Sequence, residues 1–169
     1  MEIRRAKSTD ASLISSFAEK SFRDTFQKFN SEQDMNEFCA ETYSEAVQRE
    51  EILNKDIETY LIENESQLIG FAQVCWKGKP QLFTAQKPIE INRFYILEQF
   101  HGLGVAQGLM EFLLKNAKDK NSDTIWLGVW EHNLRAIAFY KKYGFKEVGD
   151  HVFKLGSDPQ RDLILIRLV

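Results

Sequence analysis

The chain has 169 residues, of which 43% are hydrophobic and 28% are charged, a composition typical of one globular domain spanning residues 1–169. Its formal net charge is −3, which argues against nucleic acid as a partner because nucleic-acid-binding domains usually carry a basic face. No apolar run approaches the roughly 20 residues that a membrane-spanning helix needs, so we expect no membrane partner.

The first third of the chain predicts one strand and two helical regions. A short strand is expected over residues 3–6. The helix that follows ends before residue 30 and carries apolar residues on one face, namely Leu13, Ile14, Phe17, Ala18 and Phe22. Residues 33–54 are acidic and amphipathic, which predicts one or two short helices with these inward positions: Met35, Phe38, Tyr43, Val47 and Leu53.

The middle of the chain predicts an antiparallel meander. Residues 59–63 and 68–77 favour strands, and the residues 64–67 between them are typical of a hairpin turn. Residues 79–88 hold two prolines and show no regular period, so we expect a loop. A third strand is expected over residues 89–97.

The last third predicts alternating helices and strands. A helix over 105–119 precedes an apolar strand over 124–130, and a second helix over 134–143 lies between Asn133 and Gly144. Strands over 145–155 and 163–168 close the chain. The resulting order, β-α-α-β-β-β-α-β-α-β-β, indicates a mixed α/β sheet of the α+β kind rather than an alternating doubly wound sheet.

A glycine-rich turn, residues 99–104, joins the strand at 89–97 to the helix at 105–119. Such a turn at a helix N-terminus offers several backbone N–H groups to a phosphate or pyrophosphate. The three glycines Gly102, Gly104 and Gly108 follow GxGxxxG rather than the GxGxxG of dinucleotide-binding enzymes, and they lie late in the chain. A nucleotide oxidoreductase is therefore disfavoured, and a plain strand-to-helix turn stays an alternative.

Two motifs together resemble the GCN5-related N-acetyltransferase (GNAT) superfamily. The first, Gln99-x-x-Gly102-x-Gly104, resembles its coenzyme A pyrophosphate signature. The second, Asn133-x-x-Ala136-x-x-Phe139-Tyr140-x-x-x-Gly144-Phe145, resembles its other motif. The run from Trp126 to Glu131 further resembles the PaiA-type spermidine/spermine acetyltransferases. The resemblance implies a mostly antiparallel central sheet, flanked by helices, in which one parallel pair of strands splays apart.

The same resemblance implies an acetyl-CoA-dependent N-acetyltransferase. The acetyl group would move to a primary amine of a small molecule by direct attack on the thioester, with spermidine or spermine as the first expected acceptor. Two alternatives stay open: a non-catalytic module that senses acyl-CoA, and a peptide or protein N-terminal acetyltransferase. A homodimer is a further expectation, because residues 152–153 and 163–165 could form either an interface or core.

The resemblance also assigns residues to coenzyme A. Main-chain groups of the strand would pair with the pantetheine arm, an N–H near Ile96 or Leu97 would face the thioester carbonyl as an oxyanion donor, and the glycine turn would bind the pyrophosphate. Three of the residues have an alternative to cofactor binding: Asn133 can be a helix N-cap, Phe139 can be ordinary core and Lys142 can be a solvated side chain. The full expected set is Phe94, Tyr95, Ile96, Gln99, Gly102, Leu103, Gly104, Val105, Ala106, Asn133, Phe139 and Lys142.

The catalytic residues expected from the resemblance are Tyr140 and Glu90. A phenol, with a pKa of about 10, can protonate a thiolate leaving group, whose pKa is about 8.5. Tyr140 is therefore the expected general acid, with an interfacial core tyrosine as the alternative. Glu90 is the candidate base, with a solvated carboxylate as the alternative. We expect Glu131 to bind a cationic amine, unless it is a polar loop residue, and we expect three residues to help line the acceptor pocket: Phe26, Phe29 and Glu32.

The cysteines and histidines predict no metal and no covalent intermediate. Cys39 and Cys75 lie far apart, outside any CxxC pattern, and we interpret both as free thiols of a cytoplasmic protein. The three histidines lack ligand-like spacing, so no zinc site is expected. His101 lies inside the glycine turn, where its role is structural or a weak phosphate contact.

Overall fold

The structure is a computed structural model that describes residues 1–155 and 158–169. Its strands are β1 (Glu2–Arg5), β2 (Ile57–Asn64), β3 (Gln67–Cys75), β4 (Pro88–Ile96), β5 (Thr124–Trp130), β6 (Lys146–Leu155) and β7 (Asp158–Leu168). Its α-helices are α1 (Ala11–Phe26), α2 (Glu32–Tyr43), α3 (Glu45–Leu53), α4 (Val105–Asp119) and α5 (Leu134–Lys142). Short 3-10 turns η1, η2 and η3 cover Ser8–Asp10, Gln27–Phe29 and Glu98–Phe100.

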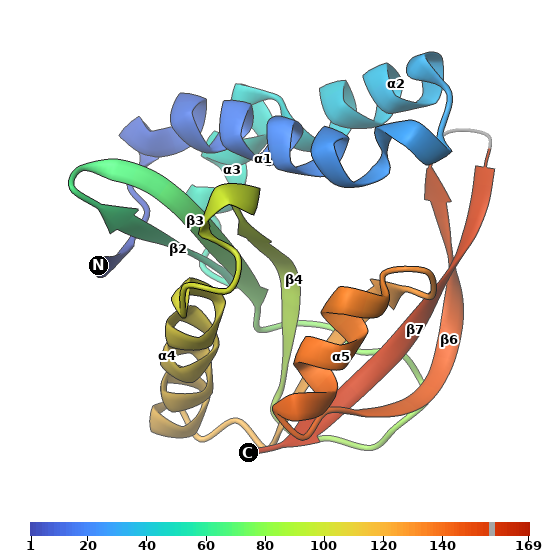
Figure 1. The fold of residues 1–169 in the computed structure, drawn as a ribbon. Coiled ribbons are helices and arrows are strands. Elements are labelled where there is room, and N and C mark those ends of the chain that lie inside the picture. Colours follow the sequence, from blue (N-terminus) through green and yellow to red (C-terminus); the bar gives the residue numbers. More distant parts are fainter. Residues whose placement is uncertain (156–157) are drawn as a thin grey trace.

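Within the described residues, all seven strands belong to one sheet in the order β1-β2-β3-β4-β5-β7-β6. Every neighbouring pair is antiparallel except β4 and β5, which are parallel. Helices α1 and α2 pack on one face of the sheet, and α4 and α5 lie against the other face (Figure 1). This architecture confirms the fold class that the sequence predicts.

The parallel pair β4–β5 stays together for only part of its length. The last paired positions are Glu90 and Trp126. Beyond them β4 continues to Ile96 against β3, and β5 continues to Trp130 against β7. The two strands therefore splay apart and leave facing edges without strand partners, as the resemblance implies.

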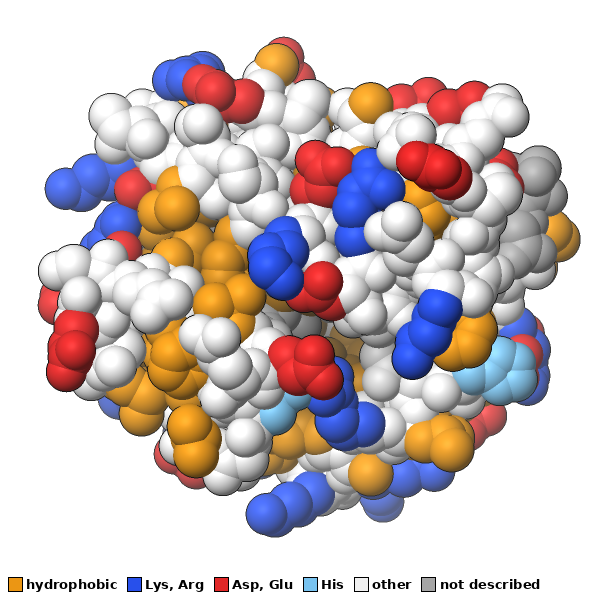
Figure 2. All heavy atoms as spheres, turned by 45° about the horizontal axis from the view of Figure 1, so that its top comes forward, with side chains coloured by type: hydrophobic (Ala, Val, Ile, Leu, Met, Phe, Trp, Pro, Cys, Tyr) orange, Lys and Arg blue, Asp and Glu red, His pale blue; other side chains and the backbone are white. Residues whose placement is uncertain are grey.

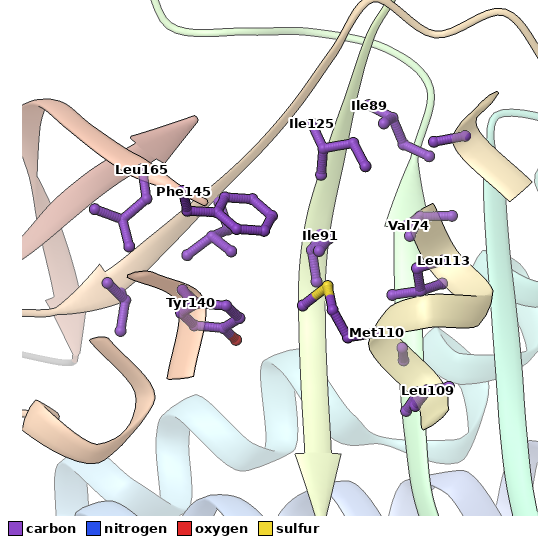
Figure 3. Close-up of a cluster of buried hydrophobic side chains, with 14 of the residues drawn as sticks. Val74, Ile89, Ile91, Leu109, Met110, Leu113, Ile125, Tyr140, Phe145 and Leu165 are labelled. Atoms are coloured by element: carbon purple, nitrogen blue, oxygen red, sulfur yellow. The ribbon is translucent and has the colours of Figure 1, made fainter. Parts of the chain in front are cut away.

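Two hydrophobic cores hold the sheet between its helices. On one face, Leu109, Met110 and Leu113 of α4 pack with Ile89 and Ile91 of β4 (Figure 3). On the other face, α1 and α2 pack on β2, β3 and the end of β6, through a cluster that includes Phe17, Phe22, Met35, Phe71 and Leu155. Because each core is anchored on a different part of β4, that strand is held rigidly next to the splayed region.

Local sequence signals account for the turns. Glu65 and Ser66 adopt φ values of 49° and 66°, the left-handed pair that a tight two-residue hairpin needs, and they join β2 to β3 as predicted. Asn133 caps α5 by accepting a hydrogen bond from the backbone N–H of Ala136 at 3.2 Å. Gly144 follows α5, and its N–H donates to the carbonyl of Lys141 at 3.0 Å.

Some sequence expectations are wrong. Leu13 and Leu53 are 46% and 68% exposed, because their helices turn other faces toward the core. Strand β7 begins at Asp158 rather than at residue 163, since it pairs with β6 along a long hairpin. The apolar residues 163–165 are buried core, whereas Val152 is 65% exposed.

Two further observations bear on expectations about partners and redox state. Cys39 and Cys75 are both free thiols, as predicted. Across the described ranges, no helix combines the length and the apolar character needed to cross a bilayer.

Candidate active site

A cavity of about 800 Å³ opens where β4 and β5 separate. We call it the central cavity. Residues 91–97 line one side of it, residues 128–130 of β5 line the other, and α1, η2, α2, the start of α4 and α5 close it. Figure 2 shows a hollow near the middle of the molecule, with hydrophobic side chains within it and Lys, Arg, Asp and Glu side chains around it. The split in the sheet thus opens a space large enough for a ligand.

The end of β4 turns selected main-chain groups toward this cavity. The N–H of Leu97 donates to the carbonyl of Ile69 on the β3 side at 2.9 Å. Hydrogen-bonding direction alternates along an antiparallel strand, so Tyr95 also bonds toward β3, whereas Phe94 and Ile96 present main-chain groups to the gap. The N–H of Leu97 is therefore engaged with β3, whereas the N–H of Ile96 faces the gap, and the oxyanion role stays a prediction.

Tyr95 contributes to the site through its side chain instead. Its ring lies on the α1–α2 side of the sheet, and its hydroxyl is 2.8 Å from the hydroxyl of Tyr43. Arg93 stacks on Tyr43 at 5.2 Å and forms a bidentate ion pair with Glu51. This buried network fixes one wall of the central cavity, because each of its charged members has a partner.

The glycine turn presents backbone N–H groups at the start of α4. Gly102 and Gly104 adopt φ values of 78° and 84°, a left-handed conformation that favours glycine. The first intrahelical bond runs from the N–H of Gly108 to the carbonyl of Gly104 at 3.0 Å. The N–H groups of residues 105–107 therefore have no acceptor within the helix. Gly102 and Ala106 line the central cavity, so this positive helix end can face a phosphate there.

His101 ties the glycine turn to its neighbours. Its Nε2 is 3.0 Å from the carbonyl of Ile96, and its Nδ1 is 2.6 Å from the Nη1 of Arg135. A guanidinium can only donate, so Nδ1 accepts from Arg135 and Nε2–H donates to the carbonyl. The neutral imidazole thereby joins the end of β4 to the first turn of α5, which is a structural role.

Tyr140 projects from α5 into the same cavity. Its ring packs edge-on against Phe94 at 6.3 Å and Phe145 at 5.7 Å. Burial raises the pKa of Tyr140 well above its ordinary value, so the phenol keeps its proton. Among the described residues its hydroxyl has no hydrogen-bond partner, and Figure 3 shows the oxygen on the side of the ring toward β4. The phenol is therefore free to donate to a ligand.

Phe139 and Asn133, beside Tyr140, also line the central cavity. The ring of Phe139 packs in a tilted arrangement with its centroid 5.8 Å from that of Phe94, so α5 and β4 meet through aromatic contacts. Asn133 is an N-cap, which does not prevent its amide from reaching a ligand. The structure thus brings together the following residues from the cofactor and catalytic sets: Phe94, Tyr95, Ile96, Gly102, Ala106, Asn133, Phe139 and Tyr140.

The opposite end of the cavity is aromatic. Phe26 and Phe29, both predicted, pack against Trp130 at 5.6 Å and 5.0 Å. Trp130 was not predicted as a site residue, although it ends β5 and lies in the run from Trp126 to Glu131 that resembles the PaiA-type acetyltransferases. Phe22, Phe38 and Tyr43 also line the cavity, within the segment 20–45 that the sequence places near the acceptor, whereas Phe153, Gln160 and Asp162 line it without having been predicted as site residues.

Glu90 lies at the last paired position of β4 and is not among the lining residues of the cavity. Burial raises its pKa to about 7. A carboxyl with such a pKa can exchange protons near neutrality. Glu90, however, lies on the paired part of β4, before the strands separate. Its role as the base stays a prediction.

Other expected site residues lie outside the cavity lining. Glu131 forms a surface ion pair with Arg161 at 3.0 Å, and Glu32 lies exposed in the first turn of α2. Val105 places its side chain in the core, so only its N–H can serve a ligand. The rest of this group, Gln99, Leu103, Gly104 and Lys142, lie at the turn or at the end of α5. Their roles stay predictions.

Within the described ranges, no group of three His, Cys, Asp or Glu side chains is arranged to hold a metal ion.

Comparisons with known proteins agree with this geometry. The model of the acetyltransferase (GNAT) family matches residues 19–145. An uncharacterized N-acetyltransferase of Lactobacillus delbrueckii subsp. lactis is 29% identical over 165 residues, covering 98% of this chain and 95% of the relative. A spermine/spermidine N(1)-acetyltransferase of Bacillus subtilis is 26% identical over 87 residues, covering 51% of this chain and 57% of the relative.

The fold has a close structural counterpart. A PaiA N-acetyltransferase from Thermoplasma acidophilum, solved in complex with coenzyme A, superposes with a TM-score of 0.77 at 23% identity, over 99% of this chain and 98% of that one. The splayed strands, the amide-bearing turn and the matched family model lead to one conclusion. The chain belongs to the acetyltransferase (GNAT) family and is an acetyl-CoA-dependent N-acetyltransferase.

Proposed function

We propose that this enzyme acetylates a primary amine of a small molecule, and that spermidine or spermine is the first acceptor to test. The observation that carries the proposal is the central cavity itself. One end of it carries main-chain amides and Tyr140, and the other end is lined by aromatic rings and a half-buried carboxylate. A thioester and an amine can therefore meet inside one cavity.

The donor end would hold acetyl-CoA through main-chain groups. The N–H groups in the first turn of α4 would receive the pyrophosphate, and the free edge of β4 would bond to the pantetheine amides. The N–H of Ile96 faces the gap and would donate to the thioester oxygen as negative charge develops on it. Fixed amides need no rearrangement during the reaction, which favours the transition state.

The leaving group would receive its proton from Tyr140. Amine attack on the thioester carbon forms a C–N bond, and the collapse of the intermediate breaks the C–S bond. The phenol is protonated, buried and without a partner among the described residues, so its proton is available to the departing sulfur. Glu90, the predicted base, would have to reach the amine through intervening water because it does not line the cavity.

The aromatic acceptor end supports a cationic acceptor. Faces of tryptophan and phenylalanine attract ammonium groups by about 0.5–2 kcal/mol each. Trp130, Phe26 and Phe29 form such a cluster at the cavity. The name of the Bacillus subtilis relative points to the same chemistry. A peptide N-terminus is also a primary amine, and two archaeal relatives at 30% identity are named N-alpha-acetyltransferases, so peptides belong in the same panel.

The test is an acceptor panel with purified protein and acetyl-CoA. Thiol release would be followed with spermidine, spermine, an aliphatic monoamine and a short peptide with a free N-terminus. We expect saturable turnover with a small amine and little with the peptide. Turnover with the peptide alone would refute the small-molecule proposal, and coenzyme A binding without turnover would favour a sensor module.

Two other features are part of the proposal. The free thiols of Cys39 and Cys75 are consistent with a cytoplasmic location, because oxidising compartments favour disulfides. A homodimer stays a prediction, and the buried position of residues 163–165 removes them as its interface.

A further inference from the structure

Three residues form a row across β5, β7 and β6 beside the acceptor end of the cavity. Trp130 lies opposite Asp162, and Asp162 lies opposite His151. Directly opposed residues of antiparallel strands project on the same face, so the three side chains share one side of the sheet. Trp130 and Asp162 both line the central cavity, which places a carboxylate next to the aromatic cluster.

A position without a side chain lies beside this row. Gly128 is two residues before Trp130 and therefore projects on the same face. A Cβ added at Gly128 would lie 3.3 Å from the Nε2 of His151 and 3.5 Å from the Oδ2 of Asp162. Gly128 itself lines the cavity, so the glycine leaves room for a ligand atom in contact with both groups.

Asp162 differs from the other acidic residues of the cavity. Asp24 is paired with Lys20 at 2.5 Å, and Glu98 is exposed next to the glycine turn. The Asp162 side chain is only 15% exposed, and the Nε2 of His151 lies 3.8 Å from its Oδ2. That separation is longer than an ordinary hydrogen bond, so His151 compensates the carboxylate only weakly. A largely buried carboxylate with so weak a contact is costly, and a bound cation would relieve that cost.

At the position above Gly128, Asp162 and His151 are the ionisable residues that face one another. On β5 the carboxylate faces Gly128 and Trp130, neither of which titrates, and on β6 it faces His151. The neighbouring Arg161 is engaged with Glu131 at 3.0 Å and with Asp150 at 2.8 Å.

We propose that Asp162 binds the ammonium group of the acceptor above Gly128 and takes up its proton, with His151 as the route of that proton to solvent. The inference rests on the proposed function and assigns the amine subsite within it. Burial raises the pKa of Asp162, which makes the carboxylate a better proton acceptor. His151 is 47% exposed, so its imidazole connects Asp162 to solvent.

In the proposed acetyl transfer, one ammonium N–H bond breaks and its proton passes to Asp162, which leaves the electron pair on nitrogen. That pair forms the C–N bond with the thioester carbon, the C–S bond breaks, and the sulfur takes the phenolic proton of Tyr140. The second proton on nitrogen restores the phenol. One proton leaves through His151, and the products are the N-acetyl amine and free coenzyme A.

The test compares Asp162→Asn with Asp150→Asn, a control on the same hairpin whose carboxylate does not line the cavity. Spermidine binding to the protein loaded with coenzyme A would be measured by calorimetry, and turnover with acetyl-CoA by thiol release. A charge-assisted contact is worth about 10- to 100-fold in binding. We expect Asp162→Asn to weaken spermidine binding and kcat/KM by this factor, with coenzyme A affinity unchanged, and Asp150→Asn to leave all three unchanged.

The pH dependence and a second variant sharpen the result. The deficit of Asp162→Asn should shrink as the pH rises toward about 10, where the free amine needs no acceptor for its proton. Gly128→Ala should lower amine affinity without changing coenzyme A affinity, because its methyl group would occupy the subsite.

The outcomes separate this inference from the proposed function. Spermidine binding that depends on Asp162, without turnover, would support the subsite and refute the proposed function. Equal binding and equal kcat/KM in Asp162→Asn and wild type would overturn the subsite while turnover upholds the function. A loss confined to Glu90→Gln would also overturn it, because the base would then be Glu90. Absence of any amine binding would refute both.

Discussion

The Glu90 carboxyl tests how burial controls the ionisation of a side chain next to the splayed strands. Glu90 lies at the last paired position of β4, opposite Trp126, and within the described residues its carboxyl makes no hydrogen bond or ion pair. Burial alone raises its pKa from 4.5 to about 7. The substitution Glu90→Gln keeps the shape of the side chain and removes the ionisable group.

The magnitude follows from the difference between the folded and unfolded pKa values. Below pH 4.5 the carboxyl is protonated in both states and costs nothing. As the pH rises toward 7, the Glu90 carboxyl loses its proton in the unfolded chain before it does so in the folded protein. Folding must then either take up a proton or bury a charged carboxylate. Above the folded pKa of about 7 the cost is complete, about 3 kcal/mol at 1.36 kcal/mol per pKa unit. Glu90→Gln should therefore stabilise the protein by about 1 kcal/mol at pH 5 and about 3 kcal/mol at pH 8.5.

Urea unfolding, followed by tryptophan fluorescence at both pH values, measures this gain. With a urea dependence of about 2 kcal/mol per molar, a gain of about 3 kcal/mol moves the midpoint by about 1.5 M. Glu147→Gln, at an exposed position of β6, is the control and should move the midpoint little at either pH. An equal gain for Glu90→Gln at pH 5 and pH 8.5 would refute the argument from charge burial.

Three further substitutions test the site, and a fourth, Gly108→Ala, is a control. Tyr140→Phe should lower kcat by about 100-fold with coenzyme A affinity unchanged, because the leaving thiolate loses its proton donor; an unchanged rate in the thiol-release assay would exclude that role. Gly104→Ala should cost about 1–2 kcal/mol in urea unfolding and weaken coenzyme A binding, since φ is 84° there. Gly108→Ala, inside α4 and with open space around its added Cβ, should not lose stability. Trp130→Ala should raise KM for spermidine about 5- to 30-fold while KM for acetyl-CoA stays constant, and equal KM values would remove the cation–π argument.

The donor half of the site could be predicted because its signals are local. The helix predicted over 105–119 is α4 to the residue, and the strand predicted over 89–97 differs from β4 by one residue at each end. Left-handed glycines, a helix N-terminus and an N-cap each depend on a few neighbouring residues. The structural roles of Gly102, Gly104 and Asn133 can therefore be inferred largely from the sequence around them.

The acceptor half could not be predicted in the same way. The segment 158–162 is polar and contains a proline, so its sequence favours a loop, yet it pairs with β6 as the start of β7. That register brings Asp162 beside His151 and Trp130, which come from three separate strands. Likewise, only the packing of α1 and η2 on β5 shows that Phe26 and Phe29 meet Trp130.

This contrast explains why family membership fixes the donor of the acetyl group but not its acceptor. Acetyl-CoA would be held by main-chain groups at the edge of β4 and the start of α4, and any sequence that splits the sheet in this way supplies them. In the proposed arrangement the acceptor would meet side chains from α1, η2, α2 and the β6–β7 hairpin, where single substitutions change charge and shape without disturbing the split. A change of acceptor is thus expected from exchanges at positions such as Trp130 and Asp162. Substrate panels on variants at those positions will therefore discriminate between acceptors better than comparison of the shared fold.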